Sequence, residues 1–254
     1  MTTPAYFDRY ANFAFERDDD GVLVMRFHTD GGSLVFTGQT HEDLPAALEE
    51  LSLDRDNRAL VITGTGDAFM DQIDGPSLGE IFKPAAWEKT RTEGAKVLQR
   101  LLEAPMPVVG VANGPAIIHS EYLLLADIHI ASERATYADF PHPQFGITGG
   151  DGVQVVWEEI AGTARAKWLL WTGQSIDAQT ALQWGVVNEV VAHERAVERG
   201  VQIAHELAAK PALYRTLQKQ TLNANLRRRI IQDVPYGMAL EGLTAADLAY
   251  QNAA

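Results

Sequence analysis

Hydrophobic and polar positions along the chain alternate between the spacing of strands and the spacing of helices. Compact apolar runs predict strands over 13–17, 21–27, 59–63, 108–111, 127–131 and 186–191. Apolar residues three and four positions apart predict helices over 40–53, 87–102 and 122–125. Strands and helices that alternate in this way indicate an α/β fold.

The second half of the chain has a different pattern. From Asp151 onward the spacing is nearly all helical, and 223–248 predicts one or two closing helices. Pro235 is expected to interrupt or kink them, since proline lacks the N–H that an interior helical position donates. The pattern changes once, near residue 200. We therefore expect an α/β core over 1–200 and a helical extension over 201–254, and not an independent second domain.

Composition excludes several classes of function. The 254 residues include 21 Lys and Arg against 34 Asp and Glu, a net charge of −13, which disfavours nucleic acid and anionic membranes as partners. Cysteine is absent, which excludes disulfides, thiolate metal sites and Cys nucleophiles. The apolar runs are too short to span a bilayer, and the first ten residues lack a secretory pattern. A cytoplasmic globular protein is the expectation.

His142 and Asp151 are the first candidates for chemistry. A neutral imidazole is the usual general base near neutral pH, and a carboxylate on its far nitrogen would fix the tautomer. Asp151 stands in the turn 149–152 before a predicted helix, so a helix N-cap is the structural alternative. With His119 these residues could nominally ligate zinc, but no short His-x-x-x-His spacing is present, and we expect no metal. No phosphate-binding loop is present either, and we expect no cofactor.

Three segments, 59–69, 107–116 and 184–190, together resemble the crotonase (enoyl-CoA hydratase/isomerase) superfamily. The resemblance implies a spiral of ββα units with C-terminal helices, assembled as trimers or dimers of trimers. Typical members hold a thioester oxygen between backbone N–H groups, one of them at a glycine-rich helix start. Here His119 falls about where such a glycine would stand, and no glycine pair is present. Ordinary thioester chemistry is therefore not expected.

The segments 140–146 and 149–157 are similar to the 6-oxocamphor hydrolase type of β-diketone hydrolases within that superfamily. This similarity implies hydrolysis of a C–C bond in a cyclic or bicyclic β-diketone without a cofactor. It also implies a functional set of five residues: His41, His119, His142, Asp151 and Glu241. Phe36 occupies the position of a tryptophan that holds a substrate carbonyl in that type. Phe36 and Leu78 are expected to line an apolar pocket for an alicyclic substrate.

In this interpretation His142 deprotonates a water molecule, and His119 stabilises the enolate that leaves. Each residue also has a structural alternative. His119 could be a partly buried histidine that the backbone satisfies, His41 a solvated first-turn residue, and Glu241 a surface carboxylate on a helix. Phe36 and Leu78 could equally be plain core. For the whole chain, the alternatives are an enoyl-CoA hydratase or isomerase, and a scaffold relative without activity.

Overall fold

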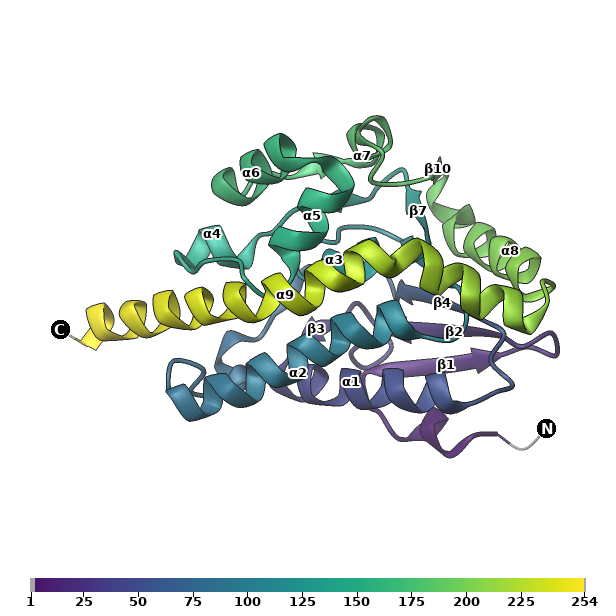
Figure 1. Ribbon diagram of the computed structural model, residues 1–254, viewed down its shortest axis with the longest axis horizontal. Coiled ribbons are helices and arrows are strands. Elements are labelled where there is room, and N and C mark those ends of the chain that lie inside the picture. Colours follow the sequence, from purple (N-terminus) through teal and green to yellow (C-terminus); the bar gives the residue numbers. More distant parts are fainter. Residues whose placement is uncertain (1–2, 254) are drawn as a thin grey trace.

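A six-stranded sheet lies at the centre of the computed structural model, which describes residues 3–253 and their side chains through 251 (Figure 1). In spatial order its strands are β1 (Phe13–Arg17), β2 (Val22–Phe27), β4 (Ala59–Gly64), β6 (Val108–Ala112), β7 (Ile128–Ser132) and β10 (Glu189–Val191). β1 and β2 form the expected antiparallel hairpin, and all other neighbours are parallel. Every residue of β4 and β6 is buried, which explains their continuous apolar sequence.

Short strands form a second layer. β3 (Val35–Phe36) pairs with β5 (Gln72–Ile73), and β8 (Thr136–Tyr137) pairs with β9 (Ile176–Asp177). Ala116 bridges Met70 on one side and Tyr137 on the other, so the short segments follow one another across this layer. Long strand, short extended segment and helix thus recur along the chain. The expected ββα spiral is confirmed.

Helices cover both faces of the central sheet. The α-helices are α1 (Gly38–Leu53), α2 (Pro84–Glu103), α3 (Glu121–Leu124), α4 (Pro141–Phe145), α5 (Val153–Ala161), α6 (Thr163–Thr172), α7 (Ala178–Trp184), α8 (Ala196–Ala208) and α9 (Ala212–Ala253). Three 3₁₀ turns add η1 (Ala5–Asp8), η2 (Gly75–Leu78) and η3 (His193–Arg195). α1, α2, α5 and α9 pack together with the larger hydrophobic core, while α8 packs alone against the other face of β4 and β6.

α8 straddles the boundary that the sequence pattern places near residue 200. Gly200 lies directly on the sheet, and an added Cβ there would clash with the side chain of Val111. Ile203 and Ala204 continue the same small apolar cluster beside Val61. The helix after residue 200 therefore shares the core of the strands before it.

The closing region differs from the expectation. α9 is one helix of 42 residues that begins at Ala212 and runs through Pro235 without a break. Pro235 removes one N–H from the helical ladder, but Ile230, Val234 and Met238 on either side are buried in the core. Burial of these side chains holds the helical path across the proline, so the expected interruption is wrong.

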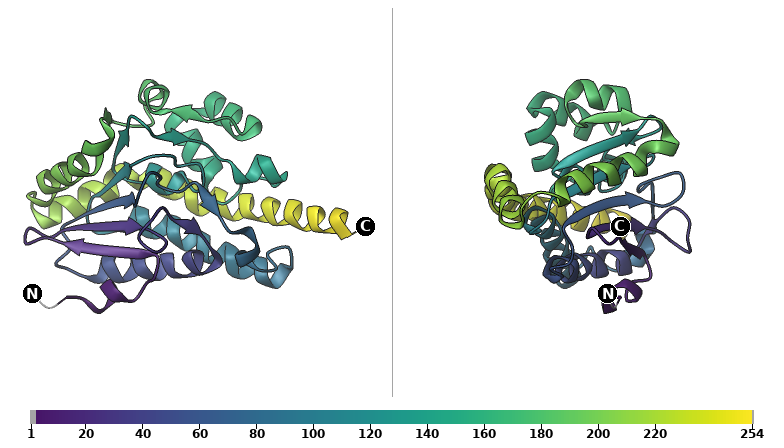
Figure 2. Two further views of the ribbon diagram at one scale, coloured as in Figure 1. Left: turned by 180° about the vertical axis from the view of Figure 1, so that it is seen from behind. Right: turned by 90° about the vertical axis from the view of Figure 1, so that its right-hand side faces the viewer.

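The last turns of α9 extend beyond the rest of the molecule, and the two chain ends lie at opposite ends of its long axis (Figures 1 and 2). Nearer the core, α9 lies alongside α2 and α5. At the start of α1 the N-cap is Thr37, whose hydroxyl accepts from the Thr40 N–H at 3.2 Å, so the helix begins at Gly38, two residues before the predicted start at residue 40. In the described part of the chain, no helix combines the length and apolar character needed to cross a bilayer.

Candidate active site

A single cavity of about 610 Å³ brings together all seven residues expected at the site. They are Phe36, His41, Leu78, His119, His142, Asp151 and Glu241. They come from the β3 strand, α1, η2, the segment before α3, α4, the turn before α5, and α9. Residues as far apart in sequence as Phe36 and Glu241 therefore line the same cavity.

The cavity wall is mainly apolar, with the ionisable groups gathered in one part of it. The apolar side chains are Phe36, Ile73, Leu78, Ile81, Phe82, Trp87, Ile118, Phe145, Ile147, Met238 and Leu248. Trp87 is held by donation of its indole N–H to the Met238 carbonyl at 3.1 Å, which joins α2 to α9 across this wall. Such a lining with a few convergent polar groups suits a compact, largely apolar ligand.

His142 stands on the short helix α4, with both ring nitrogens facing carboxylates. Its Nδ1 lies 2.7 Å from Oδ1 of Asp139, while Nε2 lies 3.4 Å from Glu241 and 3.9 Å from Asp151. Asp139 is buried, and its second oxygen has no hydrogen-bond partner among the residues that the structure describes. The carboxylate that orients this imidazole is therefore Asp139. The expected pairing of Asp151 with the far nitrogen is wrong, because Asp151 lies on the Nε2 side.

Asp151 divides its two oxygens between structure and site. Oδ1 accepts the Val153 N–H at 3.4 Å, at the start of α5. Oδ2 faces both histidines, 3.5 Å from Nδ1 of His119 and 3.9 Å from Nε2 of His142. The N-cap position itself belongs to Gly152, one residue later than the structural alternative placed it. Asp151 thus supports the helix start and links the two imidazoles at once.

Glu241 reaches the site because α9 and the turn before α5 touch at two glycines. An added Cβ at Gly150 would clash with the carbonyl of Gly237, so only glycine allows this approach. One oxygen of Glu241 then accepts the Gly150 N–H at 3.2 Å, and the other faces His142. Glu241 is 7% exposed, so it is a buried site group and not a surface carboxylate.

His119 has an unusual backbone conformation, with φ +46°. This left-handed region favours glycine and costs other residues of the order of 1–3 kcal/mol. The conformation agrees with the sequence comparison, which places His119 where a glycine is typical. The ring stacks on Tyr122, with centroids 4.7 Å apart and planes at 3°, and it also contacts Phe36 at 4.7 Å.

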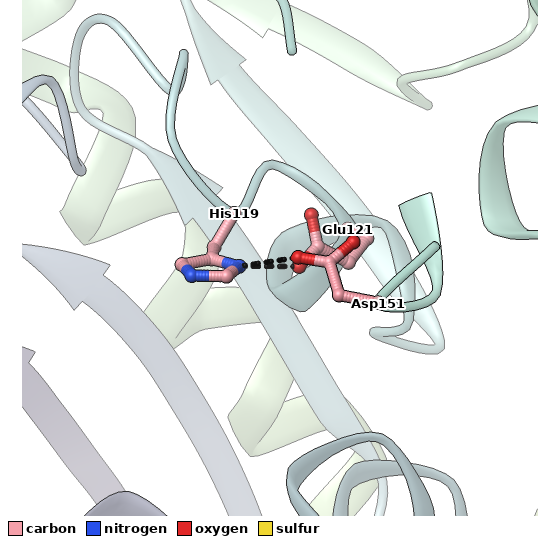
Figure 3. A group of neighbouring side chains, drawn as sticks. All are labelled: His119, Glu121 and Asp151. Carbon is pink, nitrogen blue, oxygen red and sulfur yellow. Dashed lines mark hydrogen bonds and ion pairs between the residues drawn. The ribbon is translucent and has the colours of Figure 1, made fainter. Parts of the chain in front are cut away.

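Nδ1 of His119 faces two carboxylates, Glu121 at 2.8 Å and Asp151 at 3.5 Å (Figure 3). Glu121 is 1% exposed and begins α3. The sequence analysis identified neither Glu121 nor Asp139 as a site residue. The available signal was an ionisable residue close in sequence to a candidate histidine and beside an apolar run, as in Glu121-Tyr122-Leu123-Leu124.

His41 lies apart from the other histidines. Its Nδ1 is 3.1 Å from Glu93 on α2, and Phe36 stands beside it, with ring centroids 6.1 Å apart. It is 9% exposed and not a solvated first-turn residue. Burial and the charge of His119 lower the pKa of His41, so this imidazole is neutral at pH 7. His41 forms part of the cavity wall behind Phe36.

The carboxylates change the protonation of the other two histidines. Burial alone would lower the pKa of His142, but Asp151, Asp139 and Glu241 raise it well above the ordinary value. Burial would likewise lower the pKa of His119, and Glu121 and Asp151 reverse that effect and raise it. Burial and the nearby charge of Asp151 raise the pKa of Glu241 to about 7, against the opposing effect of His142. A change in the protonation of one of these groups therefore alters the pKa values of its neighbours.

Two sets of these side chains have the geometry to hold a metal ion, and they share Asp151. One is His119, Glu121 and Asp151, and the other is His142, Asp151 and Glu241, each with ligand atoms within 4.8 Å of one another. Imidazole and carboxylate donors suit first-row divalent cations. Without a cation, Nδ1 of His119 is hydrogen-bonded to Glu121, and Nδ1 of His142 is hydrogen-bonded to Asp139. Activity without metal stays a prediction.

Comparison with known protein families gives one match over most of the chain. Residues 17–242 match the family described as enoyl-CoA hydratase/isomerase. Among characterised relatives, a short-chain-enoyl-CoA hydratase of Clostridium acetobutylicum is 29% identical over 209 residues, which are 81% of this chain and 79% of the relative. A 4-chlorobenzoyl coenzyme A dehalogenase of an Arthrobacter species is 30% identical over 211 residues, 80% of this chain and 75% of the relative.

Two solved structures are informative about the fold and the site. A β-diketone hydrolase from the cyanobacterium Anabaena sp. PCC 7120, bound to (S)-3-oxocyclohexyl acetic acid, is 44% identical with a TM-score of 0.96. The match covers 98% of this chain and all of that one. An enoyl-CoA hydratase/isomerase from Mycobacterium paratuberculosis is 26% identical with a TM-score of 0.86, covering 93% and 94% of the two chains.

Proposed function

Because the chain belongs to the enoyl-CoA hydratase/isomerase family, we propose that it applies this fold to carbon–carbon bond hydrolysis, cleaving cyclic or bicyclic β-diketones to keto acids. The observation that carries the proposal is the pair of imidazoles in one apolar cavity, each held through Nδ1 by a buried carboxylate. The similarity to a β-diketone hydrolase at 44% identity supports the same reaction class.

The first step is attack by water on one carbonyl of the diketone. Nε2 of His142, in its neutral form, removes a proton from the water molecule while the oxygen bonds to the carbonyl carbon. Asp139 on Nδ1 keeps the lone pair on Nε2 and stabilises the imidazolium that forms. The product of this step is a tetrahedral oxyanion. No serine or cysteine nucleophile is needed.

The second step is collapse of that oxyanion. Its C–O double bond re-forms, the bond to the central carbon breaks, and the electron pair delocalises onto the second carbonyl as an enolate. His119 donates a hydrogen bond from Nε2 to the enolate oxygen, since Nδ1 is already engaged by Glu121 and Asp151. The imidazolium of His142 returns its proton to the enolate carbon. The product is a keto acid, and the enzyme regains its starting protonation state.

The remaining residues have supporting roles in this proposal. Glu241 and Asp151 face Nε2 of His142, where they accept hydrogen bonds from the attacking water and stabilise the imidazolium. Phe36 and Leu78 form apolar walls against an alicyclic ring, and His41 supports Phe36 from behind. Phe36 offers no N–H donor, so in this protein the enolate oxygen depends on His119 alone among the seven expected residues.

The test is hydrolysis of a panel of cyclic and bicyclic β-diketones in H₂¹⁸O, with neither coenzyme A nor added metal. We expect loss of diketone absorbance and one ¹⁸O atom in the carboxylate of the product, because water supplies that oxygen. Crotonyl-CoA is assayed beside it with the same enzyme. Turnover of crotonyl-CoA together with inertness to every diketone would reverse the assignment.

An acyl-CoA hydratase or isomerase is the second candidate. The matching family and several of the relatives carry names that specify enoyl-CoA substrates. Coenzyme A carries several phosphate charges, which basic side chains would have to receive. Among the described residues that line the cavity, Arg91 is the one Lys or Arg. The histidine at the glycine-like position also offers a side-chain donor in place of a backbone oxyanion site. Both observations favour the diketone.

The trimer or dimer of trimers stays a prediction, as does the cytoplasmic location.

The pH dependence follows from the raised pKa of His142. The base must be neutral to accept a proton, so kcat/KM is expected to rise with pH as His142 deprotonates, above the ordinary histidine value of about 6.5. Glu241→Gln removes one of the acceptors that favour the imidazolium, so the rising limb should move by about one unit toward lower pH. A pH–rate profile of the two proteins measures this. If the rising limb of the pH–rate profile lies at the same pH in Glu241→Gln as in the wild type, Glu241 does not raise the pKa of His142.

A further inference from the structure

The cavity contains a second buried histidine–carboxylate pair whose carboxylate has no role in the mechanism so far. We propose that Glu121 is a positioning residue that holds His119 with a proton on Nε2, directed toward the oxygen on which charge develops. The proposal rests on the diketone function for the identity of that oxygen. The arrangement of His119 and Glu121 themselves does not depend on it.

The contacts of His119 leave its ring little freedom. Glu121 fixes Nδ1 at 2.8 Å, and Tyr122 and Phe36 contact the ring from two sides. Glu121 and Tyr122 are adjacent at the start of α3, so one short helix provides both the hydrogen bond and the stacking surface. With Nδ1 engaged, Nε2 is the nitrogen left to face a ligand in the cavity that His119 lines.

A carboxylate on Nδ1 also decides whether Nε2 can donate. A neutral imidazole whose single proton points at Glu121 would leave Nε2 bare, and a bare nitrogen accepts hydrogen bonds. Nε2 carries a proton when the pair holds one more, either as imidazolium with carboxylate or as neutral imidazole with carboxylic acid. Both arrangements present the same N–H to the substrate. Glu121 keeps that extra proton on the pair. In the imidazolium form the Nε2–H is a charge-assisted donor, stronger than the neutral N–H that His119 could present without Glu121.

The charged groups around His119 favour this extra proton. Glu121 and Asp151 face it with negative charge, while His142 and His41 are the titratable groups that oppose a positive charge. Burial acts against the imidazolium, and the two carboxylates outweigh it. At 1% exposure Glu121 is also shielded from water, so its field on Nδ1 is only weakly screened.

The pair of His41 and Glu93 shows that a neighbouring glutamate alone is not sufficient. Their nitrogen and oxygen lie 3.1 Å apart, yet the pKa of His41 is lowered. Burial and the charge of His119 outweigh the effect of Glu93, which is itself ion-paired with Lys89 at 2.8 Å. No lysine or arginine is ion-paired with Glu121 among the described residues. The two pairs therefore have the same chemistry, but the pKa values of their imidazoles are shifted in opposite directions, which provides a matched control.

The test is a ¹⁵N NMR titration of histidine-labelled protein without substrate, comparing the wild type with Glu121→Gln. We expect the titration midpoint of His119 to fall by at least about one pH unit in the variant, because the opposing carboxylate charge is lost. Glu93→Gln should leave that midpoint in place. The exposed pair of His205 with Asp18 provides an internal reference within each spectrum. An unchanged His119 midpoint in Glu121→Gln would overturn the proposal.

Kinetics with an active diketone give the second measurement. Glu121→Gln is expected to lower kcat about 10- to 100-fold with KM changed less than about threefold. The glutamine amide can hold a neutral imidazole with its proton on Nε2, but it does not stabilise the imidazolium, which is the stronger donor to charge that develops in the transition state. A moved titration with unchanged kcat would assign Glu121 a structural role only. If no diketone is turned over by the wild type, the proposed function fails while the titration still decides the proton question. Glu121→Asp retains the charge on a shorter side chain, so it should lower the midpoint by less than Glu121→Gln does. An equal fall of the midpoint in the two variants counts against the proposal.

Discussion

His142→Ala is expected to lower kcat for diketone hydrolysis by about 10³- to 10⁴-fold while the protein stays folded. Nδ1 of this imidazole lies beside the buried carboxylate of Asp139, and Nε2 lies on the side of Glu241 and Asp151 in the cavity. Its removal eliminates the base for the attacking water and the acid for the enolate carbon, two proton transfers in one turnover. Steady-state kinetics with the active diketone provide the measurement.

The matched control is His205→Ala, since His205 is a partly exposed histidine on α8 that pairs with Asp18 and does not line the cavity. Its kcat should stay within about twofold of the wild type. Circular dichroism confirms that both variants fold. Wild-type kcat in His142→Ala would remove the proposed base, whereas partial recovery with added imidazole would support it.

Asp139→Asn should have the next largest effect, a loss of about 10³- to 10⁴-fold in kcat. An asparagine amide donates a hydrogen bond to Nδ1, which moves the histidine proton to Nε2 and leaves the wrong nitrogen protonated for a base. KM should change little, because Asp139 acts through His142 and not on the substrate. Measuring kcat at several pH values distinguishes a loss of catalysis in Asp139→Asn from a mere shift of its pH optimum.

Asp151→Asn is the informative comparison for Asp139→Asn. Asp151 lies on the Nε2 side at 3.9 Å, so its loss leaves the tautomer of His142 intact and should cost only about 10- to 100-fold. The two variants therefore rank the carboxylates by role. The reverse order, with Asp151→Asn far more damaging, would contradict Asp139 as the orienting partner and return that role to Asp151.

The strands and the first helices were predictable because their pattern reflects burial. The runs at β4 and β6 are largely apolar because every position of those strands is buried, with both faces covered. The same reasoning failed at Pro235. Helix interruption is a local preference of proline, and it was outweighed by the burial of Val234 and Met238 in a core that local sequence does not describe.

Within the site, the residue types were predictable and two of the pairings were not. Histidine at the glycine-like position 119 and the segment around His142 already indicated imidazole chemistry. The expectation that Asp151 orients His142 came from the chemistry of the two residue types, yet Asp139 holds Nδ1 because the first turn of α4 points that nitrogen back toward it. Glu121 was overlooked because its carboxylate is directed inward by α3, whereas a glutamate is exposed by default.

Seven of the residues that line the cavity were identified with the help of the family resemblance, while the sequence by itself determined the alternation of strands and helices and the acidic and cysteine-free character of the chain. These properties depend on local periodicity and residue type, which neighbours in sequence already specify. Only the tertiary structure decided which carboxylate serves which histidine and how Glu241 reaches a turn 91 residues away. Those relations depend on ångström-scale distances between separate elements, set by backbone approach at Gly150 and Gly237 and by the left-handed turn at His119, and no local pattern encodes them.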